Sequence, residues 1–444
     1  MLDPHYEEFM ADILPFRAWR YDLAQVGDLS DVVAPPYDVI DEAFRSRLYK
    51  QHPCNVIRVD FNREEPGDTS PDDKYARAAG FVKQWQAEGV WLREKEDTLY
   101  VYHQEFDWEG RTYCRKGFIG RCRLEEFGRG CVYPHEQTLS GPKADRLLLT
   151  KATNLNLSPV FGLYPDLETK AQAVLEKAIV GLTPLEATDH LGVKHRFWPV
   201  SDRAVIDQVR DSLKSQPIFI ADGHHRYETS CNYRRWLIEQ GHDVDENHPA
   251  NFVLMMLVGM DDPGLAILPT HRLFSGLPEL TADELQSALS ANFEFEDCGT
   301  GAAGAKEAWE MVTADGGQDV FGFGTIKDGR WLFGRVTDAS PMKTIAPDQS
   351  DAWHGLGVAL LHKLVVEHCL KRAYPEANPT FKFPHILDEV IEAQHAKSCQ
   401  LAVLVPPAEI GHVQEIASKL EKMPPKSTFF YPKLLTGLVF NSLE

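Results

Sequence analysis

The sequence PIFIADGHHRYET, residues 217–229, joins an expected strand to an expected helix. The apolar run IFI stops at Asp222-Gly223, and a polar stretch with the composition of a helix continues to about Gly241. A strand that ends in a glycine turn and opens a helix directs backbone N–H groups at one point in space. Arg226 adds a guanidinium group, which can bind an anion through two parallel hydrogen bonds. The segment therefore predicts a phosphate-binding site.

Each residue from Asp222 to Arg226, called the box below, has an expected role. Asp222 is the expected ligand of a divalent metal ion, and Gly223 would let phosphate oxygens approach the backbone. The N–H groups of His224 and His225 would donate to those oxygens, and Arg226 would neutralise their charge. Asp222 and His225 are also candidate catalytic residues. A helix N-cap is the alternative interpretation, but a cap does not require two histidines and an arginine.

Candidate base and cationic groups lie in PHEQTLSGPKADR, residues 134–146: His135, Glu136, Thr138, Lys143 and Arg146. Glu136, beside the candidate catalytic His135, is the expected acceptor of a proton from a hydroxyl group. Thr138, Lys143 and Arg146 are expected to contact phosphate, and the two cations would offset charge on a transferring phosphoryl group. A solvated loop of mixed charge is the alternative interpretation.

Substrate-binding residues are expected in two further loops: Tyr37, Asp38, His271 and Arg272. Two prolines before Tyr37 predict a stiff, extended connection with a polar tip. The His-Arg pair closes an expected strand, although such a pair is also common in surface turns. Near the C-terminus, Lys426 and Lys433 flank a Ser-Thr pair, which indicates either a phosphate contact or an aromatic strand that packs this end of the chain.

The composition excludes some classes of partner. The 444 residues carry a formal net charge of −20, whereas nucleic-acid binding needs a basic surface that releases counterions. No apolar run approaches the roughly 18 to 20 residues that cross a bilayer, and the acidic start lacks the features of a secretory signal. The eight cysteines are scattered without C-x-x-C spacing, which is typical of reduced thiols. We expect a cytoplasmic protein with small-molecule partners, no nucleic-acid or membrane partner, and a homodimer as an open alternative.

An apolar fraction of 43% over this length is sufficient for two or three domains. Changes in composition predict a catalytic region over 1–278, a small α/β module over 279–342 and a C-terminal α/β region over 343–444 that packs back on the core. Strand-like and helix-like segments are mixed throughout, so the expected fold class is α/β to α+β with mixed sheets. The sequence also predicts a buried strand over 251–260 and a long helix over 353–371.

A transition-metal site is an alternative use of the histidines. His135, Asp222, His224 and His225 carry ligand types that suit zinc or iron. Adjacent histidines in one helical turn point about 100° apart, so joint ligation of one ion is awkward. The H-E-x-x-H spacing is also absent. A metal-dependent hydrolase or lyase remains a second hypothesis.

Several motifs resemble those of a known family in identity and order: VVAPPYDVI, PHEQT, PKADR, SPVFGLY, ADGHHRYET, LPTHRL and MPPKSTFFYPKLLTG. The family is the prokaryotic domain-of-unknown-function family 1015, and the similarity covers nearly the whole chain. The box is also similar to the phosphate-binding box of the ParB/sulfiredoxin-like superfamily, which includes CTP-binding partition proteins, sulfiredoxin and free-serine kinases.

This resemblance implies a ParB/sulfiredoxin-like nucleotide-binding core with a smaller appended α/β module. It also implies a nucleotide-dependent kinase that uses ATP or ADP with Mg²⁺ and converts free L-serine to O-phosphoserine. The family pattern has no clean match around the general base, so Glu136 is chosen on chemical grounds, with Asp38 as the reserve. A non-catalytic nucleotide switch, as in the partition proteins, is the alternative from another functional class.

Overall fold

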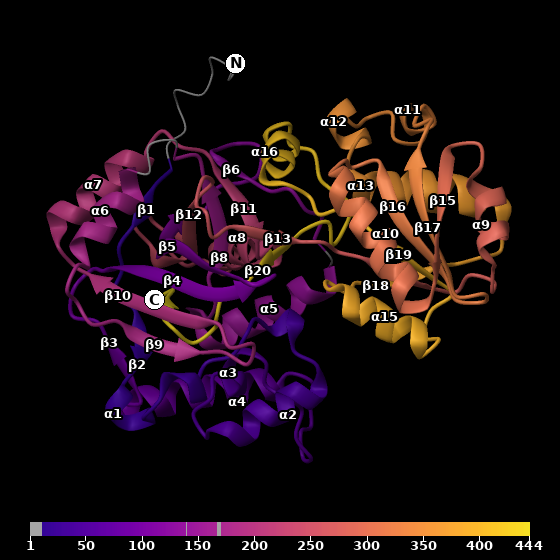
Figure 1. Cartoon of the computed structure of the whole chain (residues 1–444). Helices are drawn as coiled ribbons and strands as arrows, with labels where there is room; N and C mark the ends of the chain where they lie inside the picture. Colours follow the sequence, from indigo (N-terminus) through magenta and orange to yellow (C-terminus); the bar gives the residue numbers. More distant parts are fainter. Residues whose placement is uncertain (1–10, 139, 167–169) are drawn as a thin grey trace. The chain divides into compact units, whose positions relative to one another are not determined.

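The computed structural model describes three stretches of the chain: residues 11–138, 140–166 and 170–444. These residues form two compact units (Figure 1). Unit 1 is made of the chain up to Pro134, Thr138–Leu265 and Pro432–Glu444. Unit 2 is made of His135–Gln137 and Ala266–Tyr431. The last residues of the chain therefore belong to the same unit as the box.

The main sheet of unit 1 carries the box at the end of β11. Its strand order is β6-β11-β8-β12-β5-β4-β10-β9, and β1 pairs with β5. The pairs β11–β6 and β12–β8 are parallel, and the other neighbours are antiparallel. The strands are β1 Ile13–Leu14, β4 Leu99–Trp108, β5 Arg111–Arg123, β6 Val132–Tyr133, β8 Val160–Tyr164, β9 Leu185–Thr188, β10 Lys194–Val200, β11 Ile218–Asp222 and β12 Phe252–Gly259.

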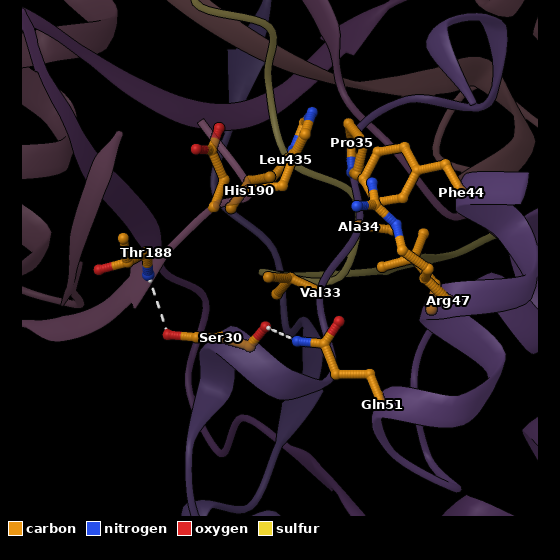
Figure 2. Close-up of a pocket in the computed structure, with 12 residues that line it drawn as sticks. Ser30, Val33, Ala34, Pro35, Phe44, Arg47, Gln51, Thr188, His190 and Leu435 are labelled. Carbon is orange, nitrogen blue, oxygen red and sulfur yellow. Dashed lines mark hydrogen bonds between the residues drawn. The ribbon is translucent and has the colours of Figure 1, made fainter. Parts of the chain in front are cut away.

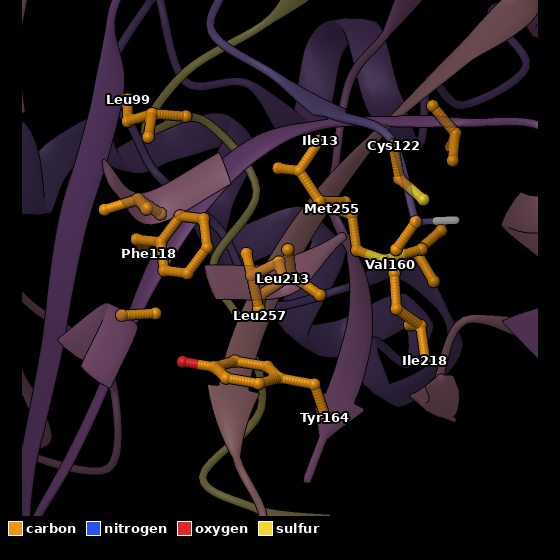
Figure 3. Close-up of a cluster of buried hydrophobic side chains, with 14 of the residues drawn as sticks. Ile13, Leu99, Phe118, Cys122, Val160, Tyr164, Leu213, Ile218, Met255 and Leu257 are labelled. Carbon is orange, nitrogen blue, oxygen red and sulfur yellow. The ribbon is translucent and has the colours of Figure 1, made fainter. Parts of the chain in front are cut away.

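The hydrophobic core of unit 1 packs helices against this sheet. Helix α7 (Arg203–Leu213) places Ile206, Val209 and Leu213 on one face, at the spacing of an amphipathic helix. All three are buried in one cluster with strand residues such as Phe118 and Met255 (Figure 3). Apolar side chains of β11 join the same cluster, so packing fixes the strand end that carries the box.

The remaining elements of unit 1 are helices and short strand pairs. The helices are α1 Leu23–Val26, α2 Glu42–Gln51, α3 Ile57–Asp60, α4 Asp73–Ala87, α5 Ser140–Thr153, α6 Lys170–Ala178 and α8 His224–Glu239, with 3₁₀ turns η2 Leu29–Asp31, η3 Tyr37–Val39 and η4 Pro249–Asn251. The short antiparallel pairs are β2 Trp19–Tyr21 with β3 Trp91–Arg93, and β7 Leu155–Asn156 with β21 Asn441–Ser442.

Unit 2 contains a second sheet with the order β15-β17-β16-β19-β14-β18 and the separate pair β13–β20. The strands are β13 Ala266–Leu268, β14 Arg272–Ser275, β15 Phe293–Thr300, β16 Val320–Thr325, β17 Arg330–Val336, β18 Thr380–Lys382, β19 Leu401–Leu404 and β20 Phe429–Tyr431. The helices are α9 Ala282–Leu289, α10 Gly301–Asp315, α11 Met342–Ile345, α12 Asp351–His354, α13 Gly357–Ala359, the π-helix Leu360–Leu370, α14 Lys371–Ala373, α15 Leu387–His395 and α16 Ile410–Ser418.

The expected mixed α/β class is confirmed, and so are the expected helix that opens at the box and the buried strand β12. Of the three strands in the expected 279–342 module, β16 pairs with β19 in the sheet of unit 2, and β19 in turn pairs with β14. The division into three regions, 1–278, 279–342 and 343–444, stays a prediction. No helix among the described residues is long and apolar enough to cross a bilayer.

The long helix expected over 353–371 is confirmed only from Gly357 onward, where α13, the π-helix Leu360–Leu370 and α14 follow one another without interruption. The expected start at Trp353 is wrong, because Trp353 lies in the separate short helix α12. Gly355 follows α12 and Gly357 begins α13. Glycine is a poor helix former, so the two glycines account for the break. Beyond it, the backbone hydrogen bonds of Leu360–Leu370 reach five residues along the chain, the pattern of a π-helix.

Candidate functional site

The box begins with a turn that only glycine accommodates well. Gly223 has φ 89° and ψ 27°, in the left-handed region, between the end of β11 and the start of α8. A Cβ atom at this position would lie 2.8 Å from Nε of Arg226. Glycine therefore provides both the backbone conformation and the space for the guanidinium group. The first N–H groups of α8 follow directly, as an anion site at a helix N-terminus requires.

Two cations contact the carboxylate of Asp222. Nη2 of Arg226 donates to its Oδ2 over 2.5 Å, and Nζ of Lys433 donates to its Oδ1 over 2.8 Å. Nη1 of Arg226 also donates to the carbonyl of Pro159. All three charged side chains are less than one-fifth exposed. Asp222 is therefore a largely buried carboxylate held between two cations.

Lys143 and Thr138 both contact Glu228, on the second turn of α8. Nζ of Lys143 lies 2.7 Å from Oε2 of Glu228, and the Thr138 hydroxyl donates to the same oxygen over 2.8 Å. Nζ of Lys143 also donates to the Thr138 hydroxyl over 2.9 Å. The structure thus brings two expected phosphate-binding residues to the helix that the box opens. Glu228 itself was not among the expected site residues.

Arg146 lies in a buried ionic network. It is 7% exposed, donates to the carbonyl of Asp60 over 2.7 Å and to its Oδ1 over 3.2 Å, and donates to Asp145 over 2.6 Å. Its guanidinium carbon lies 4.2 Å from the centre of the Tyr37 ring. Burial raises the pKa of Tyr37 to about 12, against the opposing charges of Arg146 and Arg226.

Asp38 belongs to the same electrostatic neighbourhood. Burial raises the pKa of Asp60; the charges of Arg146 and Arg226 lower it, and that of Asp38 raises it. Tyr37 therefore lies within electrostatic range of the box arginine, and Asp38 lies within electrostatic range of Asp60.

A small polar cavity lies beside the box, with lining residues from several elements: Asp60, Arg146, Asn156, Ser158, Arg226 and Thr229. The Thr229 hydroxyl is buried and has no hydrogen-bond partner among the described residues. A buried polar group without a partner costs about 1–3 kcal/mol, so such a group marks a position where a ligand or water is expected. Asp60 and Thr229 were missed by sequence reasoning, although Thr229 is one helical turn beyond His225 on α8.

The other expected site residues belong to unit 2. Nε2 of His135 lies 3.0 Å from the Thr428 hydroxyl, and Oε1 of Glu136 accepts a hydrogen bond from the backbone N–H of Lys426 over 2.9 Å. Arg272 is fully buried and donates to the carbonyl of Lys426 over 2.8 Å. Burial lowers the pKa of Arg272 to about 9, although the charge of Glu136 raises it.

His271 is also buried and contributes to the backbone network of unit 2. Its Nδ1 accepts a hydrogen bond from the N–H of Val405 over 3.1 Å. Burial lowers the pKa of His271 to about 3, so the ring is neutral at neutral pH. His271 and Arg272 therefore lie inside unit 2 and not in a surface turn.

The described residues contain no group of three or more His, Cys, Asp or Glu side chains placed to bind a metal ion. The expected magnesium ion does not require such a group, because Mg²⁺ is commonly bound by one or two carboxylates together with substrate phosphates. Asp222 is the expected carboxylate for such an arrangement.

The chain is similar to one protein family and to several solved structures. Residues 13–358 match the model of a family described as "Protein of unknown function (DUF1015)". No curated protein matches the sequence. Solved structures of free serine kinase variants in complex with AMP and with ADP have TM-scores of 0.34 and 0.33, both at 11% identity over 68% of this chain and 84% of theirs. A conserved hypothetical protein from Pyrococcus furiosus has a TM-score of 0.32 at 12% identity, over 68% of this chain and 89% of its own.

Proposed function

The chain belongs to the DUF1015 family, and we propose that it transfers a phosphoryl group from a nucleotide to a hydroxyl group of a small molecule. One observation carries this proposal. The box combines a left-handed glycine, the N-terminus of α8, and a carboxylate in contact with Arg226 and Lys433. Phosphoryl transfer depends mainly on positioning and on neutralising charge, which are the properties of such a site.

The nucleotide would bind with its phosphates at the box. The N–H groups of His224 and His225 are suited to donate to phosphate oxygens, and Arg226 supplies a positive charge. Asp222 is the proposed ligand of Mg²⁺, which when bound would neutralise phosphate charge. ATP and ADP are the proposed donors, on the basis of the motif resemblance to the free-serine kinases.

In the proposed reaction, the acceptor hydroxyl oxygen forms a bond to phosphorus while the bond to the leaving nucleotide breaks. The hydroxyl proton passes to a carboxylate. Asp38 and Glu136 are the two proposed bases. The position of Asp38, within electrostatic range of Asp60, which lines a cavity together with Arg226 of the box, favours Asp38.

Free L-serine is the proposed acceptor and O-phosphoserine the proposed product. The motif resemblance supports this acceptor. The cavity beside the box has a volume of only about 40 Å³, which suits a small polar group rather than a whole amino acid, and the Thr229 hydroxyl offers such a group a hydrogen bond. A cytoplasmic location remains part of this proposal.

Incubation of the full chain with hydroxy amino acids and ATP, ADP or CTP, followed by ³¹P NMR, tests the proposal. We expect a phosphomonoester signal with serine and a loss of that signal in Asp222→Asn. Nucleotide binding without transfer to any acceptor would support the nucleotide switch instead. Stoichiometric zinc or iron in the purified protein would support the metal-dependent hydrolase or lyase.

A further inference from the structure

A cavity of about 260 Å³ in unit 1 has a lining distinct from that of the polar cavity beside the box (Figure 2). Residues from the segment 30–35, helix α2, the end of β9 and the C-terminal stretch meet around it. Known ligand pockets have volumes of about 300 to 1,000 Å³. A cavity near the lower limit suits a small metabolite.

The base of this cavity is apolar and fixed in place. Val33, Ala34, Leu48 and Leu435 line it and are each at most 4% exposed. Two backbone hydrogen bonds of 3.1 and 2.8 Å join Ala34 to Thr436. A ligand can therefore bury an apolar body here without first ordering the protein.

The rim carries a guanidinium group. The Arg47 guanidinium carbon lies 4.6 Å from the centre of the Phe44 ring, and the His190 ring lies 4.5 Å from the same centre. Figure 2 shows Arg47 and Phe44 next to each other on α2. Among the described residues, Arg47 has no ion pair and no hydrogen bond. Its five N–H donors therefore have room for a charged acceptor at the cavity.

Asp189, which contributes a carboxylate to the cavity lining, is already paired with other groups of the protein. Oδ1 of Asp189 accepts hydrogen bonds from the N–H groups of Leu191 and Val193 over 2.8 and 3.0 Å, and Oδ2 lies 3.4 Å from Nε2 of the buried His195. Burial raises the pKa of Asp189, but these contacts hold it below its ordinary value. Asp189 thus stabilises the β9–β10 turn, and Arg47 has no carboxylate partner there.

Hydrogen bonds also hold the polar side of the cavity lining in place. The N–H of Thr188 donates to the Ser30 hydroxyl over 2.9 Å, and the amide of Gln51 donates to the Ser30 carbonyl over 3.2 Å (Figure 2). These bonds connect three of the segments that form the cavity. The cavity therefore exists before any ligand arrives.

We propose that this cavity binds a small organic anion, either a carboxylate or a phosphate ester, with its charge at Arg47 and its apolar body against Val33 and Leu48. A charged group and an apolar body are both needed, because the cavity offers one cation above a buried apolar base. This site is additional to the box and does not depend on phosphoryl transfer.

Calorimetric titration of the full chain with four probes tests the ligand class. We expect saturable binding of benzoate or phenyl phosphate, and binding weaker by about tenfold or more for neutral benzyl alcohol and for inorganic phosphate, which each lack one of the two features. Equal binding of benzyl alcohol would overturn the proposal, and so would the absence of saturable binding of both organic anions at millimolar concentration.

Single substitutions test whether the organic anion binds at Arg47. Arg47→Gln should weaken organic-anion binding about tenfold or more, with partial recovery in Arg47→Lys. Arg45→Gln is the matched control, because Arg45 lies on the same helix over another ring, Phe61, and we expect it to leave binding unchanged. Loss of binding in Arg226→Gln with full binding in Arg47→Gln would place the anion at the box and overturn the proposal.

Hydrogen–deuterium exchange gives a second readout that needs no variant. We expect benzoate or phenyl phosphate to protect peptides from residues 28–51 and 185–193. Protection of residues 217–229 in their place would contradict the proposed location.

Discussion

Lys433 and Asp222 are 211 residues apart in sequence, yet Nζ of Lys433 donates to Oδ1 of Asp222 over 2.8 Å. The lysine comes from the C-terminal stretch of unit 1, two residues beyond β20. It lies opposite Arg226, which contacts the other carboxylate oxygen. The carboxylate at the end of β11 therefore depends on a distant part of the chain for one of its cationic partners.

We expect Lys433→Met to lower the free energy of unfolding by about 2 kcal/mol, because a hydrogen bond between charged groups is lost at a largely buried carboxylate. Urea unfolding followed by circular dichroism measures the change. Lys426→Met is the control, since Lys426 is an exposed lysine of the same C-terminal motif without an ion pair in the described part of the chain. If the two variants were equally stable, the contact between Lys433 and Asp222 would not contribute measurably to the free energy of unfolding.

Gly223→Ala should be more destabilising than Gly241→Ala. Both glycines have a positive φ, 89° and 83°, so both substitutions introduce backbone strain of about 1–3 kcal/mol. Only at Gly223 would the new Cβ meet Arg226, whereas nothing lies within 4 Å at Gly241. Thermal unfolding of the two variants measures the difference, and equal losses would show that the close approach of Arg226 is unimportant.

Asp38→Asn and Glu136→Gln distinguish the two proposed bases. If Asp38 accepts the proton, Asp38→Asn should lower the rate of phosphoryl transfer about 100-fold or more, within the usual range for loss of a general base. Glu136→Gln would then retain more activity than Asp38→Asn. Single-turnover measurements with ATP and serine, together with nucleotide binding by calorimetry, separate the chemical step from affinity. Loss of transfer only in Glu136→Gln would instead identify Glu136 as the base.

Acid should destabilise the fold through His271. Burial lowers its pKa in the folded chain to about 3, from an ordinary value of 6.5. Between these values the unfolded chain binds a proton that the folded chain does not, so the free energy of unfolding falls as the pH is lowered. The full contribution is present above about pH 6.5.

Melting temperatures measured between pH 8 and pH 4 test this direction. The amide oxygen of His271→Gln can still accept the hydrogen bond from Val405, and the variant has no titrating group at this position. We expect a shallower dependence of its melting temperature on pH than in the natural sequence. Identical pH profiles would mean that other groups cause the acid sensitivity.

Local features of the box could be predicted from sequence because they depend on neighbouring residues. The apolar run before Asp222, the glycine and the polar helix define a strand, a turn and a helix start within a few residues. The contacts of Lys433 and Asp60 could not be predicted in this way, since they join segments that are distant in the chain. Their partners depend on how the strands and helices pack.

Burial changed the interpretation of His271 and Arg272. Their residue types suggested a site or a surface turn, but both are fully buried in unit 2. Arginine is rarely buried, so there was no reason from the sequence to expect Arg272 in the interior. Its burial depends on acceptors such as the carbonyl of Lys426, which lies far away in the sequence and is brought close only by folding. Gly355 and Gly357 were visible in the sequence, and they explain why the expected long helix begins only at Gly357.

The position of Lys433, 211 residues after Asp222 in the sequence, also sets the order in which the two side chains become available during synthesis. A ribosome that has produced residues 1–431 has already made Asp222, Gly223 and Arg226, but not the lysine that contacts Asp222. The strand β21, which pairs with β7 in unit 1, is made later still. Domains generally fold from the N-terminus during translation, and here Asp222 acquires its contact with Lys433 only after a further 211 residues have been made.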